Sequence, residues 1–196
     1  MVTNGVCHFW DNSSCEGTQN CPPRCPRFFD REGEPLLIRE FSSDDFTALV
    51  NMYASLGPAD QTMGIPPQEE ATIEQWLTTM IADGWNLLAL HRDKTVVGHV
   101  AVTPASATDP EFVIFLRRGY RNRGIGTELL KQLLAHTETM DHENLLLEVS
   151  RHNQQAIHVY QNIGFDTVEQ TAMAQKMAVS LREAVVEEFQ EPPANR

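Results

Sequence analysis

Apolar residues recur along the first half of the chain with two periods, and each period predicts a different element. Short apolar runs predict a strand over 36–41 and a hairpin of two further strands over 85–91 and 95–103. Apolar positions three and four residues apart predict helices over 44–56 and 68–82. This half is therefore expected to fold as strands covered by helices.

The second half alternates in the same way. Its predicted elements are a strand over 112–116, a helix over 124–139, a strand over 145–149, a helix over 153–163 and two final strands between 165 and 181. A strand, a helix and a second strand in this order are typical of a right-handed crossover between parallel strands. The pattern predicts an α/β fold that contains one such parallel pair.

The segment Arg121-Asn122-Arg123-Gly124-Ile125-Gly126 separates the apolar strand from the Leu-rich helix. Its two glycines leave the first N–H groups of the helix open to a ligand, and this end of a helix favours anions. Arg121 and Arg123 add positive charge. The segment lacks the third glycine of a dinucleotide fingerprint and the Lys of a P-loop. It therefore predicts a phosphate site of another kind.

A second motif follows the strand over 145–149. It consists of Asn153, Ala156, Tyr160 and Gly164-Phe165 at fixed spacing. Together with the Arg-x-x-Gly-x-Gly loop, and in this order, it resembles the GNAT superfamily of acyl-CoA-dependent N-acyltransferases. The resemblance covers roughly Leu36 to Met177.

This resemblance implies a mixed, mostly antiparallel sheet with flanking helices, in which the central parallel strands splay apart to admit the pantetheine of acetyl-CoA. The loop would bind the pyrophosphate, and the strand backbone would hold the thioester and polarise its carbonyl. The implied coenzyme-binding residues are Phe115, Leu116, Arg121, Asn122, Arg123, Gly124, Ile125, Gly126, Thr127 and Asn153. Because no Cys or Ser nucleophile lies beside either motif, transfer is expected to be direct.

Two residues are candidates for acid–base chemistry. An amine attacks a thioester only as the neutral base, whereas a lysine amine with a pKa of about 10.4 is protonated at pH 7. Glu111, ahead of the apolar strand, is the candidate base that takes this proton. The alternative is a solvated strand end, with Glu148 as the second candidate base. His99 is expected to be a packed residue.

Tyr160 is the candidate acid. A phenol near the sulfur of the coenzyme can protonate the departing thiolate or donate a hydrogen bond to it. The alternative is a core tyrosine whose hydroxyl has another partner.

Glu111 also matches the place of a glutamate in Pat-type protein lysine acetyltransferases, so the expected function is acetyl transfer from acetyl-CoA to a protein lysine. A small-molecule amine or a protein N-terminal amine is the alternative acceptor. A non-catalytic acyl-CoA sensor is the alternative of a different class.

All four cysteines lie near the N-terminus, in a proline-rich segment without helical or strand periodicity, and are Cys7, Cys15, Cys21 and Cys25. Clustered thiols in a reducing compartment favour metal over disulfides, and zinc holds such loops together. The spacing lacks paired Cys-x-x-Cys knuckles. A structural zinc site, free or redox-active thiols, and another metal or cluster therefore remain open.

The composition of the chain limits the classes of binding partner that are expected. The 196 residues carry 27 acidic and 15 basic side chains, a net charge of −12, which argues against nucleic acid. The acidity fits either steering of a cationic substrate or adaptation to high salt. No apolar run approaches the ~18 residues of a membrane span, and the N-terminus lacks the features of a signal peptide. A cytoplasmic protein without a membrane partner is expected.

Three regions are expected along the chain. Residues 1–33 form the Cys-rich segment, residues 34–181 the acyltransferase domain, and residues 182–196 an acidic tail with a short helix and then disordered chain.

Overall fold

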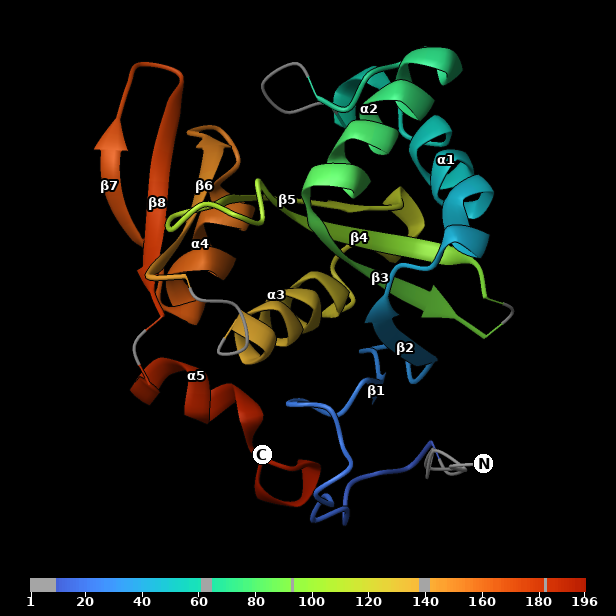
Figure 1. Ribbon diagram of the computed structural model, residues 1–196, viewed down its shortest axis with the longest axis vertical. Coiled ribbons are helices and arrows are strands. Elements are labelled where there is room, and N and C mark those ends of the chain that lie inside the picture. The colour runs from blue at the N-terminus through green and yellow to red at the C-terminus, as the bar shows by residue number, and fades with distance from the viewer. Residues whose placement is uncertain (1–9, 61–64, 93, 138–141, 182) are drawn as a thin grey trace.

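The computed structural model describes residues 10–60, 65–92, 94–137, 142–181 and 183–196. Eight strands form one sheet in the order β1-β2-β3-β4-β5-β6-β8-β7 (Figure 1). The strands are β1 (Arg27–Phe29), β2 (Pro35–Glu40), β3 (Trp85–His91), β4 (Val96–Thr103), β5 (Glu111–Leu116), β6 (Asn144–Ser150), β7 (Asp166–Gln170) and β8 (Ala174–Ser180). The predicted α/β class is confirmed.

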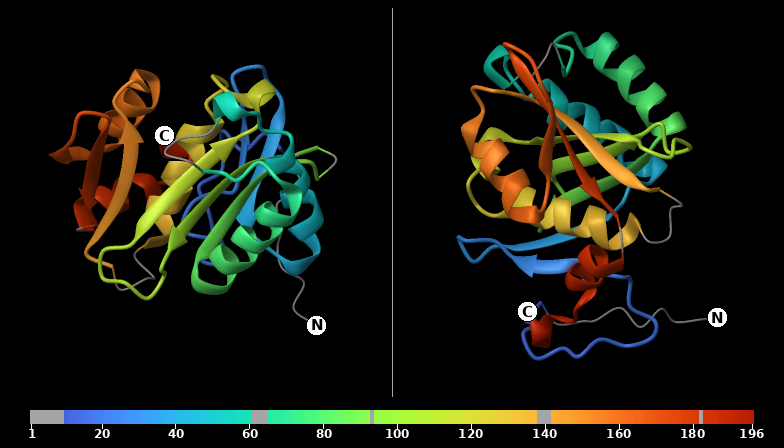
Figure 2. Two further views of the ribbon diagram at one scale, coloured as in Figure 1. Left: turned by 90° about the horizontal axis from the view of Figure 1, so that it is seen from above. Right: turned by 90° about the vertical axis from the view of Figure 1, so that its left-hand side faces the viewer.

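One pair of neighbouring strands is parallel. β5 and β6 share a single register pair, Glu111 with Leu146, at their N-terminal ends, whereas the other neighbours are antiparallel. Beyond this pair the two strands part, and β6, β8 and β7 diverge from the rest of the sheet (Figures 1 and 2). This is the splayed pair that the sequence predicts, and it opens the sheet at the C-terminal end of β5.

Helices cover both faces of the sheet. α1 (Phe46–Ala54) and α2 (Glu70–Asp83) lie on one face, and α3 (Ile125–Thr137), α4 (Gln154–Ile163) and α5 (Glu183–Gln190) belong to the other (Figure 1). None of the described helices is long and apolar enough to cross a bilayer.

Side chains of β5 alternate between the two faces, as a strand requires. Phe115 contacts the rings of Tyr53 and Trp76 on the α1 and α2 face, with ring centroids 5.5 and 6.4 Å away. Phe112 contacts Tyr160 and Phe165 on the opposite face. Glu111, two and four residues before Val113 and Phe115, shares their face.

The N-terminal segment is less irregular than the sequence predicts. Residues 27–29 form β1, which pairs with β2 at the edge of the sheet. The turn between them is held by Asp30, whose Oδ1 accepts hydrogen bonds from the backbone N–H groups of Glu32 and Glu34. Gly33 closes the turn with a left-handed φ of 79°. A three-residue strand is too short to show a period, which is why the pattern does not reveal it.

The C-terminal tail is also more structured than the sequence predicts. After α5 the chain ends in a short 3-10 turn at Pro193–Asn195. The N–H of Ala194 donates to the carbonyl of Cys15, 3.1 Å away, so the C-terminal turn contacts the N-terminal segment at Cys15. Phe189 of α5 is buried in the same core as α3. The expected disordered end is therefore not what the structure shows.

Candidate active site

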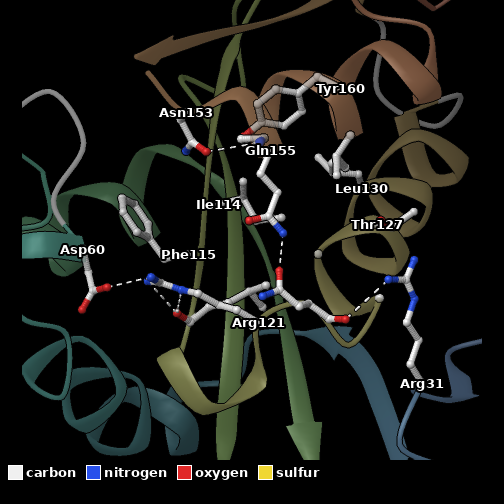
Figure 3. A pocket seen from close by; sticks show the side chains of 16 residues that line it. Arg31, Asp60, Ile114, Phe115, Arg121, Thr127, Leu130, Asn153, Gln155 and Tyr160 are labelled. Atoms are coloured by element: carbon white, nitrogen blue, oxygen red, sulfur yellow. Dashed lines mark hydrogen bonds and ion pairs between the residues drawn. The ribbon is translucent and has the colours of Figure 1, made fainter. Parts of the chain in front are cut away.

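A pocket of about 330 Å³ lies where β5 and β6 part. It runs from the end of β5 across the glycine loop to the start of α4 (Figure 3). The predicted site residues that line it are Phe115, Leu116, Arg121, Asn122, Gly124, Gly126, Thr127, Asn153 and Tyr160. The two sequence motifs, separated by a helix and a strand, therefore form one cavity.

The backbone of the loop leads directly into α3. Asn122 and Gly124 have left-handed φ angles of 65° and 86°, a conformation that glycine adopts freely and asparagine more readily than most other residues. The carbonyl of Gly124 accepts the first helical hydrogen bond, from the N–H of Glu128. The N–H groups of the turn before Glu128 have no partner within the helix and suit an anion.

The carboxylate of Glu128 would oppose an anion at this helix end, but it is neutralised. Its Oε1 lies 2.6 Å from the Nε of Arg24, and both side chains are largely buried. Arg24 also donates to the carbonyl of Phe189. An ion pair between the N-terminal segment and α3 thus offsets the negative charge of Glu128.

Arg121 and Arg123 are both paired with carboxylates. Arg121 lines the pocket, with Nη1 2.7 Å from Asp60 Oδ1, and it also donates to the carbonyl of Leu116 (Figure 3). Arg123 does not line the pocket, because its Nε donates to Oδ2 of Asp30 at 2.6 Å. Much of the positive charge read from the loop sequence is therefore balanced within the protein.

The pKa values of the two carboxyl groups agree with this pairing. Burial acts to raise the pKa of Asp60, but the backbone N–H of Gly57 and the guanidinium of Arg121 outweigh it and hold the pKa below its usual value. The pKa of Asp30 is lowered in the same way: burial opposes the shift, while the N–H of Glu34 and the guanidinium of Arg123 favour it. Both groups are carboxylates at neutral pH.

A further predicted residue, Ile125, does not line the pocket, whereas several residues that were not predicted do. Ile125 is fully buried in the core under α3 and does not line the pocket. Gln155 lines it and donates its amide to the side-chain oxygen of Asn122, while Ile114 lines it from β5. Arg31 lines it from the turn after β1. It belongs to neither motif, and nothing in the sequence pattern singles it out.

Tyr160 lies in α4 with its ring in the core and its hydroxyl at the pocket (Figure 3). The ring contacts Phe112 and Phe165, with centroids 6.1 and 5.9 Å away. Burial raises the pKa of the phenol to about 12, so it stays protonated at neutral pH. Among the described residues, no side chain or backbone group forms a hydrogen bond with this hydroxyl. It is thus a donor that faces the pocket.

Glu111 lies outside the pocket, at the N-terminal end of β5, and its side chain is about half exposed. Its Oε1 accepts a hydrogen bond from Lys176 Nζ at 2.7 Å. Lys176 lies on β8 directly across from Glu148 of β6 and Glu169 of β7. The hydrogen bond that Lys176 donates to Glu111 contributes most to raising the pKa of Lys176, and the charges of Glu111, Glu169 and Glu148 add to it.

His99 is fully buried in β4, as expected of a packed residue. Its Nδ1 lies 2.8 Å from the hydroxyl of Tyr53, and its Nε2 lies 2.9 Å from Oδ1 of Asn86. Because a carboxamide oxygen only accepts, Nε2 carries the proton and Nδ1 accepts from Tyr53. Burial lowers the pKa of His99 to about 3. The ring is neutral and does not line the pocket.

The cysteines gain no support as metal ligands. No group of three or more Cys, His, Asp or Glu side chains comes close enough to hold a metal within the described ranges. Cys15, Cys21 and Cys25 are free thiols, and Cys7 lies outside the described residues. The segment is held instead by hydrogen bonds, such as that from Gln132 Nε2 to the carbonyl of Cys25 at 2.6 Å.

Comparison with known proteins gives a family match and several matching folds. Residues 35–166 match the family described as acetyltransferase (GNAT) domain. No curated protein matches the chain. The GNAT domain of S. lividans PAT superimposes with a TM-score of 0.68 and 17% identity, covering 79% of this chain and 95% of that chain.

Two further solved structures are similar. The acetyltransferase of GNAT family from Streptococcus pneumoniae has a TM-score of 0.61 and 22% identity, over 74% of this chain and 99% of that one. A spermidine N-acetyltransferase from Vibrio cholerae, in complex with CoA and spermine, has a TM-score of 0.60 and 16% identity, over 74% and 95%. At these identities the similarity establishes the fold.

Proposed function

The chain belongs to the GNAT family of acetyltransferases, and we propose that it transfers the acetyl group of acetyl-CoA directly to a primary amine, with a protein lysine side chain as the first candidate acceptor. One observation carries this proposal: the glycine loop, the parted strands and the hydroxyl of Tyr160 all meet in one pocket.

The residues of this chain fit the coenzyme. The N–H groups at the start of α3 and the hydroxyl of Thr127 would bind its phosphates. The apolar side chains of Ile114 and Val159, which line the pocket, suit the pantetheine arm. Backbone N–H groups of β5 left unpaired by the splay would hydrogen-bond the thioester carbonyl and stabilise the oxyanion formed in the transition state.

Glu111 would receive the proton that the acceptor ammonium must lose before the neutral amine attacks. Along β5 it is three residues, or about 10 Å, from Ile114, so the proton would reach the carboxylate through a chain of waters rather than by direct contact. Its present partner, the ammonium of Lys176, is the same chemical group as a lysine acceptor. The carboxylates of Glu111, Glu148 and Glu169 together make this face of the sheet suited to a cationic amine.

Tyr160 would act on the leaving group. As the C–N bond forms and the C–S bond breaks, negative charge collects on the sulfur of CoA. A phenol with a pKa near 12 is a weaker acid than a thiol with a pKa of about 8.5. Tyr160 would therefore stabilise the thiolate with a hydrogen bond rather than transfer its proton fully.

The experiment is incubation of the protein with acetyl-CoA and a panel of acceptors. Acetyl-lysine is located by mass spectrometry on proteins, and CoA release is followed with polyamines and other small amines. Acetylation of protein lysines above the uncatalysed background supports the proposal. Turnover of small amines alone would replace the lysine acceptor with a small molecule, and binding of acetyl-CoA without any turnover would favour a sensor.

A further inference from the structure

Three arginines surround the glycine loop, but they differ in their partners. Arg121 is paired with Asp60, and Arg123 with Asp30 and Glu32. Arg31 lines the pocket and, within the described part of the chain, forms no ion pair. Its one side-chain hydrogen bond there is long, 3.5 Å from Nη1 to the carbonyl oxygen of Asn122. A guanidinium without a counter-ion thus faces the proposed phosphate site.

The position of Arg31 is fixed by its backbone. Its N–H donates to the carbonyl of Arg123 at 3.0 Å, which joins the β1–β2 turn to the loop. Its Cγ and Nε lie 3.8 Å from where a side chain on Gly124 would begin, so the side chain crosses the loop at this glycine. Figure 3 shows it on the side of the loop away from Arg121, close to Thr127.

We propose that Arg31, carried by the N-terminal segment, is a phosphate-binding residue of the coenzyme site, so that the segment before the acetyltransferase domain forms part of the site. The proposal rests on the proposed function, because the phosphate is that of a bound coenzyme A. The residue lies before the region that matches the family, residues 35–166. The phosphate it binds is either the diphosphate or the 3′-phosphate of the coenzyme.

The physical reason is charge. The N–H groups at the start of α3 supply only partial positive charge, and the guanidinium groups of Arg121 and Arg123 are already balanced by carboxylates. A coenzyme carries several negative charges on its phosphates. An unpaired guanidinium that forms two parallel N–H···O bonds is well suited to such a group.

The test is titration calorimetry of the full chain at low ionic strength with CoA, dephospho-CoA and pantetheine. For Arg31→Gln we expect the Kd for CoA to rise about fivefold to tenfold, and this difference to shrink as salt is added. Binding of pantetheine, which has no phosphate, is expected to stay unchanged. The Kd of Arg31→Lys for CoA should lie between that of the wild type and that of Arg31→Gln.

Arg92→Gln is the matched control. Arg92 contacts the same turn through Glu34 at 2.8 Å, carries the same charge and does not line the pocket. The Kd of the Arg92→Gln variant for CoA should equal that of the wild type. If the rise in Kd caused by Arg31→Gln disappears when dephospho-CoA is the ligand, Arg31 binds the 3′-phosphate. If the rise persists, Arg31 binds the diphosphate.

Wild-type affinity for CoA in Arg31→Gln would overturn the inference, as would an equal loss of pantetheine binding. Either result leaves the proposed function standing. Failure of the wild-type protein to bind CoA at all would instead remove the proposed function and this inference together.

Discussion

Arg123 lies against Asp30, with its Nε 2.6 Å from the Oδ2 of that carboxylate, and so joins the glycine loop to the N-terminal hairpin. The carboxylate of Asp30 is completely buried and the side chain of Arg123 is 12% exposed. The loop is thus supported by a contact 93 residues away in sequence.

Breaking this pair should destabilise the protein. Arg123→Gln leaves the carboxylate of Asp30 buried without its guanidinium, so we expect the free energy of unfolding to fall by about 3 kcal/mol in urea titrations. The control is Arg118→Gln in the turn just before the loop, because the side chain of Arg118 is 68% exposed and lies 3.4 Å from Asp60. The free energy of unfolding of Arg118→Gln should fall by less than about 1 kcal/mol. Equal losses in the two variants would contradict a structural role for the buried pair.

Glu111→Gln tests the base. We expect the rate at neutral pH to fall by about 10²-fold. The deficit should shrink at high pH, because more of the acceptor amine is then already neutral. Glu148→Gln is measured beside it, because Glu148 is the second candidate base and also lies opposite Lys176; a loss confined to Glu111→Gln assigns the role to Glu111. A mutant-to-wild-type ratio that is flat across pH would remove Glu111 from this role.

Tyr160→Phe tests the donor to the leaving group. The ring keeps its contacts with Phe112 and Phe165, so stability and the KM for acetyl-CoA should change little. Loss of the hydroxyl should lower kcat by roughly 10- to 100-fold in single-turnover and steady-state assays. An unchanged kcat with the chemical step rate-limiting would make Tyr160 an ordinary core residue.

His99 should make stability depend on pH. Its folded pKa of about 3 lies below its ordinary value of 6.5, so the unfolded chain binds a proton that the folded protein does not. Stability is therefore lost as pH falls below about 6.5, by at most ~1.4 kcal/mol per pH unit from this residue.

The variant His99→Gln isolates this effect. It should be less stable than the wild type at pH 7, because Tyr53 and Asn86 lose their partner. The gap in unfolding free energy should narrow from pH 6.5 toward pH 4. His158→Gln is the control, because His158 is an exposed residue of α4. A gap that stays constant with pH would show that His99 does not titrate on unfolding.

The sequence predicts this fold well where a periodic pattern of apolar residues extends over many positions. Alternation and helical spacing place β3 to β6 and α1 to α4 within a few residues, because burial of one face imposes those periods. The spacing of the glycine loop and of Asn153 to Phe165 predicts which segments form the pocket. β1 is missed because its three residues carry no period.

The ion-pair partners of charged residues cannot be predicted from these patterns. Arg121 and Arg123 look like phosphate ligands in the sequence, yet the carboxylates that pair with them, Asp60 and Asp30, come from distant segments. Arg31 faces the pocket only because the turn after β1 is tied to the loop. Such contacts depend on tertiary structure, which local sequence patterns do not encode.

The most direct test of the account is calorimetric titration with acetyl-CoA of the wild type and of Gly126→Val. A β-carbon at position 126 would lie 3.2 Å from the Leu116 side chain, and the added methyl groups would occupy the pocket. We expect saturable one-to-one binding to the wild type and at least tenfold weaker binding, on the order of 1.4 kcal/mol or more, to a folded variant. No binding to the wild type, or equal binding to both, would contradict it.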